Sequence, residues 1–236
     1  MDNKVLMFFK DLLKRKSNIR VKLLGDSITH GVGGDGFKQS GDPIVPGYAR
    51  NPDGYCWANM LRDYMSEKYG AEVINNACTG TKIEFIIDNF DGLVSKDDDI
   101  VICTIGTNNR HYYKKDGPRP DKKDYMSAFY ANIQTLNGMF KNAGINVVFV
   151  ANIPAALSNE RDGEDYWRIF YMNDVNDMYK KAAEEFDFLF VSLYDLFVGY
   201  CEKEQLTVDS LLCDGLHPNN EGHAAMFRLL SEEFGI

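Results

Sequence analysis

Three side chains, Ser27, Asp214 and His217, are of the types that together turn a hydroxyl group into a nucleophile. A serine hydroxyl attacks poorly until a base accepts its proton, and a carboxylate must hold that base in the correct tautomer. Asp214 and His217 lie three residues apart, so on a helical turn their side chains would share one face. The spacing therefore predicts covalent chemistry at Ser27, with His217 as the base and Asp214 as the group that orients it.

A negatively charged oxygen that develops during such a reaction needs hydrogen-bond donors that are fixed beforehand. The backbone N–H groups of Ser27 and Gly80, each in a predicted strand-to-helix turn, and the side-chain amide of Asn108 supply three donors. Glycine at position 80 would also let a substrate approach the backbone closely. These three residues are the predicted oxyanion hole.

Each of these residues also has a simpler explanation. Ser27 taken alone is typical of a helix N-cap or a turn. The other donors are common turn formers, and the acid and the base could instead cap the last helix. His30 is a competing base, but it shares the turn of Ser27 and lacks a neighbouring carboxylate, so it is interpreted as part of a pocket wall.

Further residues near these motifs are predicted to contact the substrate or to line its pocket: Asp26, His30, Asn109, Arg110 and His111. For Asp26, bonding to local backbone N–H groups is the alternative role. Cys78 and Cys103 lie in apolar surroundings near predicted strand ends, so they are interpreted as buried structural thiols.

Short apolar runs alternate with longer helical patterns along the chain. The runs predict strands at 21–24, 72–75, 100–104, 146–150 and 188–191. Most are continuously apolar, as strands are when both faces of a sheet are covered. The helical patterns span about 55–69, 81–90, 122–142, 164–186 and 220–234. This alternation predicts a parallel sheet with helices on both faces and right-handed crossovers.

The candidate residues fall at one edge of this predicted sheet. In such sheets, ligands bind beyond the carboxyl ends of the strands. The candidates follow the first three strands directly or precede the last helix. Two long segments rich in turn formers, 31–54 and 110–121, are assigned to the same edge, and loops of this length are usually functional.

The composition is that of an ordinary soluble globular protein. The 236 residues include 26 Lys and Arg against 35 Asp and Glu, and the resulting net charge of −9 argues against a nucleic-acid surface. The five cysteines are scattered without a C-x-x-C pair, so neither a disulfide framework nor a metal site is predicted, and no cofactor is expected. No repeat or linker divides the chain, which predicts one domain over residues 1–236.

The segment 1–18 is interpreted as a helix that packs on or beside this domain. Its apolar run, 5–9, is too short for a signal peptide, and no stretch of the chain is long enough to span a membrane, so a cytoplasmic location is expected. The helical spacing of apolar residues over 3–16 leaves an interfacial membrane helix as the alternative.

Taken together, four blocks of the sequence resemble the SGNH hydrolases, also called the GDSL esterase/lipase family. The blocks are Gly-Asp-Ser-Ile at 25–28, the glycine at 80, Gly-Thr-Asn-Asn at 106–109 and Asp-Gly-Leu-His at 214–217. Two positions depart from the family pattern: Ala77 replaces an earlier glycine of the second block, and Asn109 replaces an aspartate of the third. Neither position carries the chemistry in the family.

The resemblance implies a flavodoxin-like three-layer α/β/α sandwich with a five-stranded parallel sheet. It also implies that Ser27 is the nucleophile, that Ser27, Gly80 and Asn108 form the oxyanion hole, and that Asp214 and His217 are the acid and the base. The expected activity is hydrolysis of carboxylic esters through an acyl-enzyme.

A small-molecule or carbohydrate ester is the expected substrate, with an acetyl ester of a carbohydrate preferred by analogy to family members of this length. Aromatic residues at 37, 48, 55 and 57 could stack on a sugar ring. A lysophospholipase or acyl-thioesterase is the alternative within the class, and the apolar N-terminal segment would favour it. A phosphate- or flavin-binding domain is the alternative without catalysis, with residues 25–27 holding an anion at a helix N-terminus. The oligomeric state does not follow from the sequence.

Overall fold

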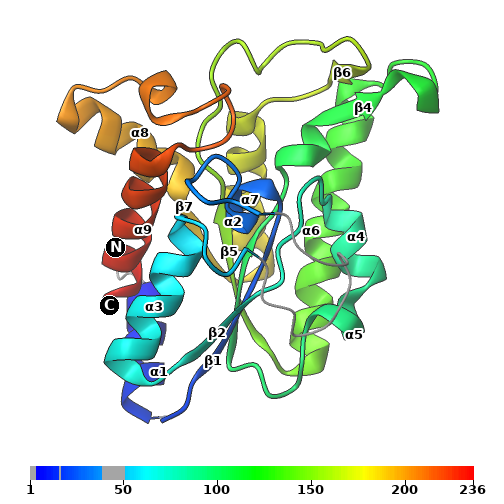
Figure 1. Cartoon of the computed structure of the whole chain (residues 1–236). Helices are drawn as coiled ribbons and strands as arrows, with labels where there is room; N and C mark the ends of the chain where they lie inside the picture. The colour runs from blue at the N-terminus through cyan, green and yellow to red at the C-terminus, as the bar shows by residue number, and fades with distance from the viewer. Residues whose placement is uncertain (1–3, 16, 39–50) are drawn as a thin grey trace.

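The computed structural model describes residues 4–15, 17–38 and 51–236, and its centre is a parallel sheet (Figure 1). The sheet has five strands in the order β2-β1-β3-β5-β7. Their bounds are β1 Arg20–Gly25, β2 Glu72–Asn75, β3 Ile100–Thr104, β5 Asn146–Ala151 and β7 Leu189–Ser192. All four neighbouring pairs run parallel. The predicted sheet and its five strands are confirmed, and the strand order is that of flavodoxin-like folds.

Alternate residues of the central strands enter two separate hydrophobic clusters, because successive side chains point to opposite faces of a sheet. In β3, Ile100 and Ile102 belong to one cluster, whereas Val101 and Cys103 belong to the other. Every residue of β3 is buried. The strands are thus covered on both faces, which explains why they are continuously apolar in sequence.

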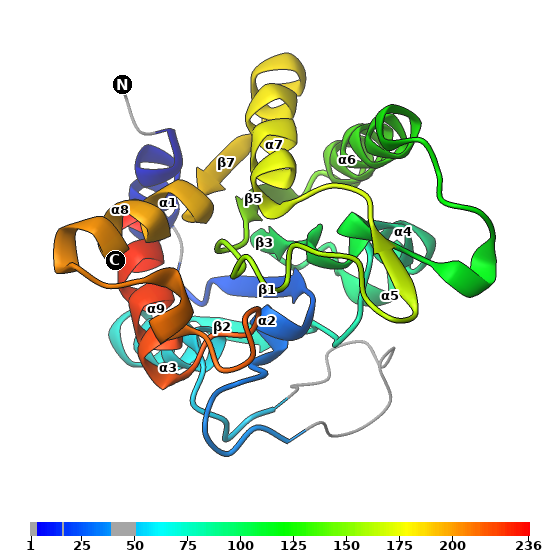
Figure 2. The same cartoon turned by 90° about the horizontal axis from the view of Figure 1, so that it is seen from above.

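The helices form a layer on each face of the sheet (Figure 2). One layer consists of α1 Lys4–Arg15, α3 Trp57–Tyr69, α8 Leu193–Glu204 and α9 Asn220–Phe234. The opposite layer consists of α4 Ile83–Asp88, α5 Phe90–Leu93, α6 Lys122–Ala143 and α7 Met172–Phe186. The helix α2, Ser27–His30, lies at the end of β1.

Two predicted helices differ from the observed ones. The pattern over 164–186 is not one helix, because Tyr166–Arg168 forms the strand β6 and the helix α7 begins only at Met172. β6 pairs antiparallel with β4, His111–Tyr113, inside the segment predicted to be irregular. The predicted helix over 81–90 is divided into α4 and α5 at Asn89.

Other elements were not predicted from the sequence. The helix α8 follows β7 directly, and Ser192 caps its N-terminus by accepting a hydrogen bond from the N–H of Asp195. The short 3-10 helices are η1 Thr107–Arg110, η2 Lys114–Asp116 and η3 Val208–Leu211. Of these, η1 matters most for the site, because it carries the third sequence block.

The N-terminal helix α1 packs on the domain through its apolar face. The rings of Phe9 and Phe234 stack with their centroids 4.3 Å apart, and Val5 is buried beside them. Phe8, Leu12 and Leu13 pack against the same cluster. In the described ranges, no helix is both long and apolar enough to cross a bilayer. The amphipathic character of α1 is therefore explained by its packing against α9.

This packing predicts a large difference between two substitutions in α1. Phe9→Ala should lower the free energy of unfolding by about 3–5 kcal/mol, because it removes a buried ring and leaves a cavity against Phe234. Met7→Ala is the matched control, since Met7 is 60% exposed and its loss should change that free energy by less than about 0.5 kcal/mol. Urea unfolding followed by circular dichroism measures both, and equal effects would contradict the packing of α1.

Candidate active site

Ser27 lies at the carboxyl end of β1, in the turn that begins α2. Asp26 is the N-cap of this helix, and its Oδ1 accepts a hydrogen bond of 3.0 Å from the N–H of Ile28. Gly31 ends the helix in the left-handed conformation, with its N–H bonded to the Ser27 carbonyl. As the first residue of the helix, Ser27 has an N–H group without an intrahelical acceptor. The turn thus presents both the hydroxyl and the N–H of Ser27.

His217 approaches Ser27 from the loop before α9. Its Nε2 lies 2.8 Å from the Oγ of Ser27, and its Nδ1 lies 2.7 Å from the Oδ2 of Asp214. These distances place the three side chains in one hydrogen-bonded chain across 190 positions of sequence. The structure brings together the residues that were predicted to act as nucleophile, base and orienting acid.

The turn that joins Asp214 to His217 is a bend and not the helical turn that was predicted. The Oδ1 of Asp214 accepts hydrogen bonds from the N–H groups of Leu216 and His217, at 3.0 and 2.8 Å. The side chain of Asp214 therefore folds its own loop and orients the imidazole at the same time. The helix α9 begins later, at Asn220, with Asn219 as its N-cap.

The pKa of Asp214 is lowered from its usual value. Burial acts to raise it, but the hydrogen bonds from the backbone and the ring of His217, together with that from Leu216, outweigh this effect. Asp214 is thus ionised at neutral pH and can only accept hydrogen bonds. The Nδ1 of His217 must then carry the proton, which leaves Nε2 to accept from the Ser27 hydroxyl.

Gly80 and Asn108 lie in two neighbouring turns. Gly80 has a φ of +82°, which favours glycine, and within the described part of the chain no neighbouring atom lies within 4 Å of the place where a Cβ would stand. The side-chain nitrogen of Asn108 donates to the Thr81 carbonyl at 3.0 Å, which joins η1 to the Gly80 turn. Asn109 joins the same two segments, because its Oδ1 accepts from the N–H of Ile83 at 3.0 Å.

Four residues that were predicted to contact the substrate have buried side chains: Asp26, His30, Asn109 and Arg110. The His30 ring bonds the hydroxyl of Thr79 and contacts the ring of Phe37. Asn109 and Asp26 bond backbone N–H groups, as described above. These side chains hold the loops of the site from beneath, and their contact with a substrate stays a prediction.

Arg110 fastens a distant loop to η1. Its Nη1 lies 2.6 Å from Glu160, its Nη2 donates to Asn159 and its Nε donates to the Thr107 carbonyl. Burial lowers the pKa of Arg110 to about 10, and the neighbouring Arg168 adds to this effect. The guanidinium remains charged at neutral pH, and its donors bind protein atoms rather than a ligand.

His111 is the predicted pocket residue that stays partly exposed. Burial lowers its pKa to about 3, and the nearby charges of Lys82, Arg168 and Arg110 contribute in the same direction. Its ring contacts those of Tyr113 and Tyr166, with centroids 5.0 and 5.1 Å away. His111 is therefore neutral at pH 7 and belongs to an aromatic group on the β4–β6 ribbon.

Asn152 was not identified from the sequence, and Thr107 was named there only as a member of the third block. Asn152, directly after β5, donates from its Nδ2 to Asp26 and to the hydroxyl of Thr107. Both Asn152 and Thr107 are buried. Asn152 could have been found from its position directly after a predicted strand, because the candidate residues after the first three strands were found in this way.

The aromatic residues proposed for sugar stacking divide into different environments. Tyr55 is exposed and Phe37 is partly exposed, but Trp57 is completely buried in α3, so it cannot stack on a ligand. Tyr48 lies outside the described residues.

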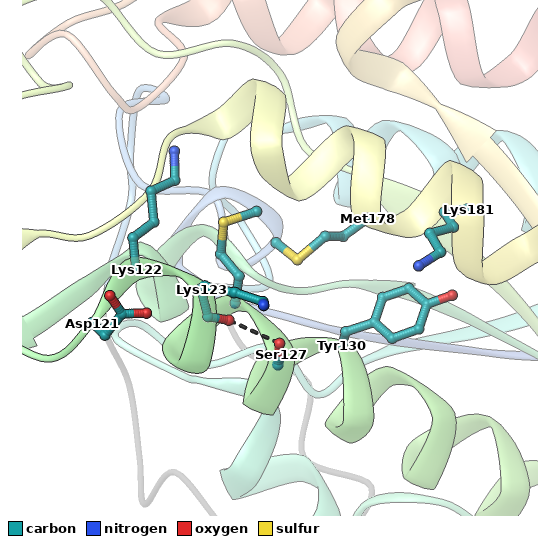
Figure 3. Close-up of a pocket in the computed structure, with 8 residues that line it drawn as sticks. Asp121, Lys122, Lys123, Ser127, Tyr130, Met178 and Lys181 are labelled. Atoms are coloured by element: carbon teal, nitrogen blue, oxygen red, sulfur yellow. Dashed lines mark hydrogen bonds between the residues drawn. The ribbon is translucent and has the colours of Figure 1, made fainter.

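Within the described ranges, no group of three or more His, Cys, Asp or Glu is arranged to hold a metal ion. The five cysteines are free, and Cys78 and Cys103 are buried as predicted. A groove of about 610 Å³ lies between α6 and α7 and is lined by Met126, Tyr130 and Met178 with lysines around them (Figure 3). None of the candidate catalytic residues lines this groove.

The comparison with protein families agrees with this arrangement. The sequence matches the GDSL-like lipase/acylhydrolase family over residues 23–225, so the chain belongs to this family. It is accordingly a carboxylic ester hydrolase, and the resemblance seen in the four blocks is confirmed. No curated protein matches the sequence.

Solved structures with the same fold share little sequence with this chain. Axe2, an acetylxylan esterase from Geobacillus stearothermophilus, is 20% identical with a TM-score of 0.66, and the match covers 93% of this chain and 95% of that one. LAE5, an alpha/beta hydrolase enzyme from the metagenome of Lake Arreo, is 17% identical with a TM-score of 0.64, covering 94% and 98%. At these identities the likeness shows the fold alone.

The His217 loop packs closely against the segment that follows α2, which leads to a prediction. A Cβ at Gly33 would lie 2.2 Å from the Pro218 carbonyl oxygen, whereas the nearest described atom to a Cβ at Gly36 would be the Asp53 carbonyl oxygen, 3.7 Å away. Both glycines have a positive φ, so alanine at either position adopts an unfavourable backbone conformation. Gly33→Ala should lower the free energy of unfolding by about 1–3 kcal/mol more than Gly36→Ala, because only Gly33→Ala also overpacks the loop. Equal losses in urea unfolding would show that this contact is unimportant.

Proposed function

We propose that this protein hydrolyses short-chain carboxylic esters through an acyl-enzyme on Ser27, with acetyl esters of carbohydrates as its substrates. The hydrogen-bonded chain from Ser27 through His217 to Asp214, with distances of 2.8 and 2.7 Å, is the observation that carries the mechanism. The ionised Asp214 sets the tautomer in which His217 accepts the serine proton.

In the first half of the reaction, the Ser27 oxygen attacks the ester carbonyl while its proton passes to the Nε2 of His217. The N–H groups of Ser27 and Gly80 and the amide of Asn108 donate to the oxyanion of the tetrahedral intermediate. The intermediate then collapses, the bond to the alcohol breaks, and His217 gives its proton to the leaving oxygen. Water repeats these steps on the acyl-enzyme and releases the acid.

The proposed acyl group and alcohol rest on analogy and on exposed aromatic residues. Solved structures of Axe2 include catalytic mutants at one serine, one aspartate and one histidine, and the last two are three positions apart, like Asp214 and His217. Axe2 itself is described as an acetylxylan esterase. On this chain, Tyr55 and Tyr113 expose aromatic surface that could stack on a sugar ring.

The alternatives explain fewer of the observations. A lysophospholipase or thioesterase was favoured by the apolar N-terminal segment, but the apolar face of α1 is used in packing against α9. Binding of a phosphate or a flavin would not require the hydrogen-bonded chain of Ser27, His217 and Asp214. Ester hydrolysis uses all three residues.

The serine mechanism predicts that Ser27→Ala abolishes hydrolysis of p-nitrophenyl acetate while circular dichroism stays unchanged. The expected loss in kcat is about a thousandfold or more, because the residues of such a triad act as a unit. A fluorophosphonate probe should label the wild type and leave Ser27→Ala unlabelled. Retention of activity or labelling in this variant would exclude Ser27 as the nucleophile.

The acetyl preference is tested with p-nitrophenyl esters of increasing chain length and with acetylated xylose. We expect kcat/KM to fall by about tenfold or more between the acetate and the octanoate, because an enzyme for acetyl esters gains no binding energy from a longer acyl chain and has to accommodate its extra methylene groups. Acetate release from the sugar should also be detectable by an enzymatic assay. An optimum at eight carbons or longer would instead support the lysophospholipase or thioesterase alternative.

A further inference from the structure

We propose that Asn152 is a positioning residue that fixes the turn carrying Ser27 and the turn carrying Asn108 at one relative geometry. This inference rests on the proposed function, because the relative position of the two turns matters for catalysis only when both supply donors to one oxyanion hole. Nothing in the family blocks or in the comparisons assigns a role to this residue.

The contacts of Asn152 connect three strand ends. Its Nδ2 donates to the Oδ2 of Asp26 at 3.1 Å and to the Oγ1 of Thr107 at 2.8 Å. Asp26 follows β1, Thr107 follows β3 and Asn152 follows β5, and these strands are consecutive in the sheet. One amide nitrogen therefore connects the carboxyl ends of three neighbouring strands.

Each partner of Asn152 positions one of the three proposed oxyanion donors. Asp26 caps α2 through the N–H of Ile28, and this cap fixes the first residue of the helix, Ser27. Thr107 begins η1, in which Asn108 is the next residue. A shift of Asn152 would therefore move the N–H of Ser27 relative to the amide of Asn108.

The chemistry of the network requires an amide at position 152. Asp26, Thr107 and Asn152 are all buried, so water cannot replace a lost hydrogen bond. Only a side chain with two N–H donors on one atom can serve both acceptors, whereas an aspartate would place a second acceptor against Asp26. Leucine has a similar size and donates to neither.

The network also controls the charge of Asp26. Burial raises the pKa of Asp26 to about 6, while hydrogen bonds from Thr107 and Ile28 and the charges of His217 and Arg110 act to lower it. Cys103 and Tyr179 also face this carboxylate, and burial keeps both of them neutral. Removal of a donor from the network must raise the pKa of Asp26, because the ionised form loses its partner.

The test compares Asn152→Leu with Asn137→Leu in the full-length protein, with p-nitrophenyl acetate as the substrate. Asn137 is the matched control, since it is a buried asparagine in α6 whose Oδ1 has no hydrogen-bond partner among the described residues. We expect Asn152→Leu to lower kcat by about ten- to a hundredfold with an unchanged KM, because misplaced donors affect the transition state and not substrate binding. Asn137→Leu should leave kcat within about twofold of the wild type.

The pKa of Asp26 separates positioning from a merely structural role. In Asn152→Leu, this pKa should rise by about one unit, as expected for a lost donor to a charged group, and the carboxyl carbon signal of Asp26 followed by NMR across pH measures it. Thr107→Val should raise the same pKa, and Thr107→Ser, which keeps the hydroxyl, should restore the wild-type value. The threonine pair keeps the test decisive if Asn152→Leu does not fold.

Three outcomes would overturn the proposal. These are an unchanged kcat in folded Asn152→Leu, a raised KM at constant kcat, and a pKa of Asp26 that stays unchanged in Thr107→Val. Failure of the proposed function is a different result, because it would appear in the wild type as the absence of both hydrolysis and fluorophosphonate labelling.

Discussion

The burial of the central strands on both faces is the constraint on which the rest of the structure depends. Because β1, β3 and β5 are covered on both faces, most of their side chains are apolar, and polar groups gather where the strands end. The buried charge inside β1, Lys22, lies 3.7 Å from the carboxylate of Asp98. Asp26, Thr107 and Asn152 lie just past these ends, bonded to one another. The sheet that favours apolar side chains in its interior thus has most of its polar groups at its carboxyl edge.

This constraint explains how much could be predicted from the sequence. Short apolar runs, most of them continuous, identified all five strands of the sheet, and the polar residues after them identified the edge at which Ser27, Gly80 and Asn108 lie. The β4–β6 ribbon escaped prediction because its strands are only three residues long and derive their stability from pairing between segments about 50 positions apart. The helix α8 was not predicted because it begins immediately after β7, without turn residues between the two elements.

Burial of polar side chains was the other feature that the sequence could not supply. Arg110 and His30 belong to types usually found at least partly at the surface, so their place beside the motifs suggested contact with a ligand. Arg110 is buried because Glu160 and Asn159, about 50 positions away, provide acceptors for its guanidinium. Such partners are brought close only by the tertiary structure, so they cannot be predicted from the residues near Arg110 in sequence.

The two carboxylates of the site illustrate how environment separates their roles. Asp214 is 51% exposed and its pKa is lowered, whereas Asp26 is fully buried and burial raises its pKa from 3.8 to about 6. On acidification, Asp26 therefore takes up a proton before Asp214 does. A pKa raised in the folded state means that the stabilisation from protonated Asp26 is present below about pH 4 and is lost as the pH rises through 6. Mild acid thus favours folding at Asp26 while it weakens the acceptor that orients Asn152, so activity and stability should respond to this group in opposite directions.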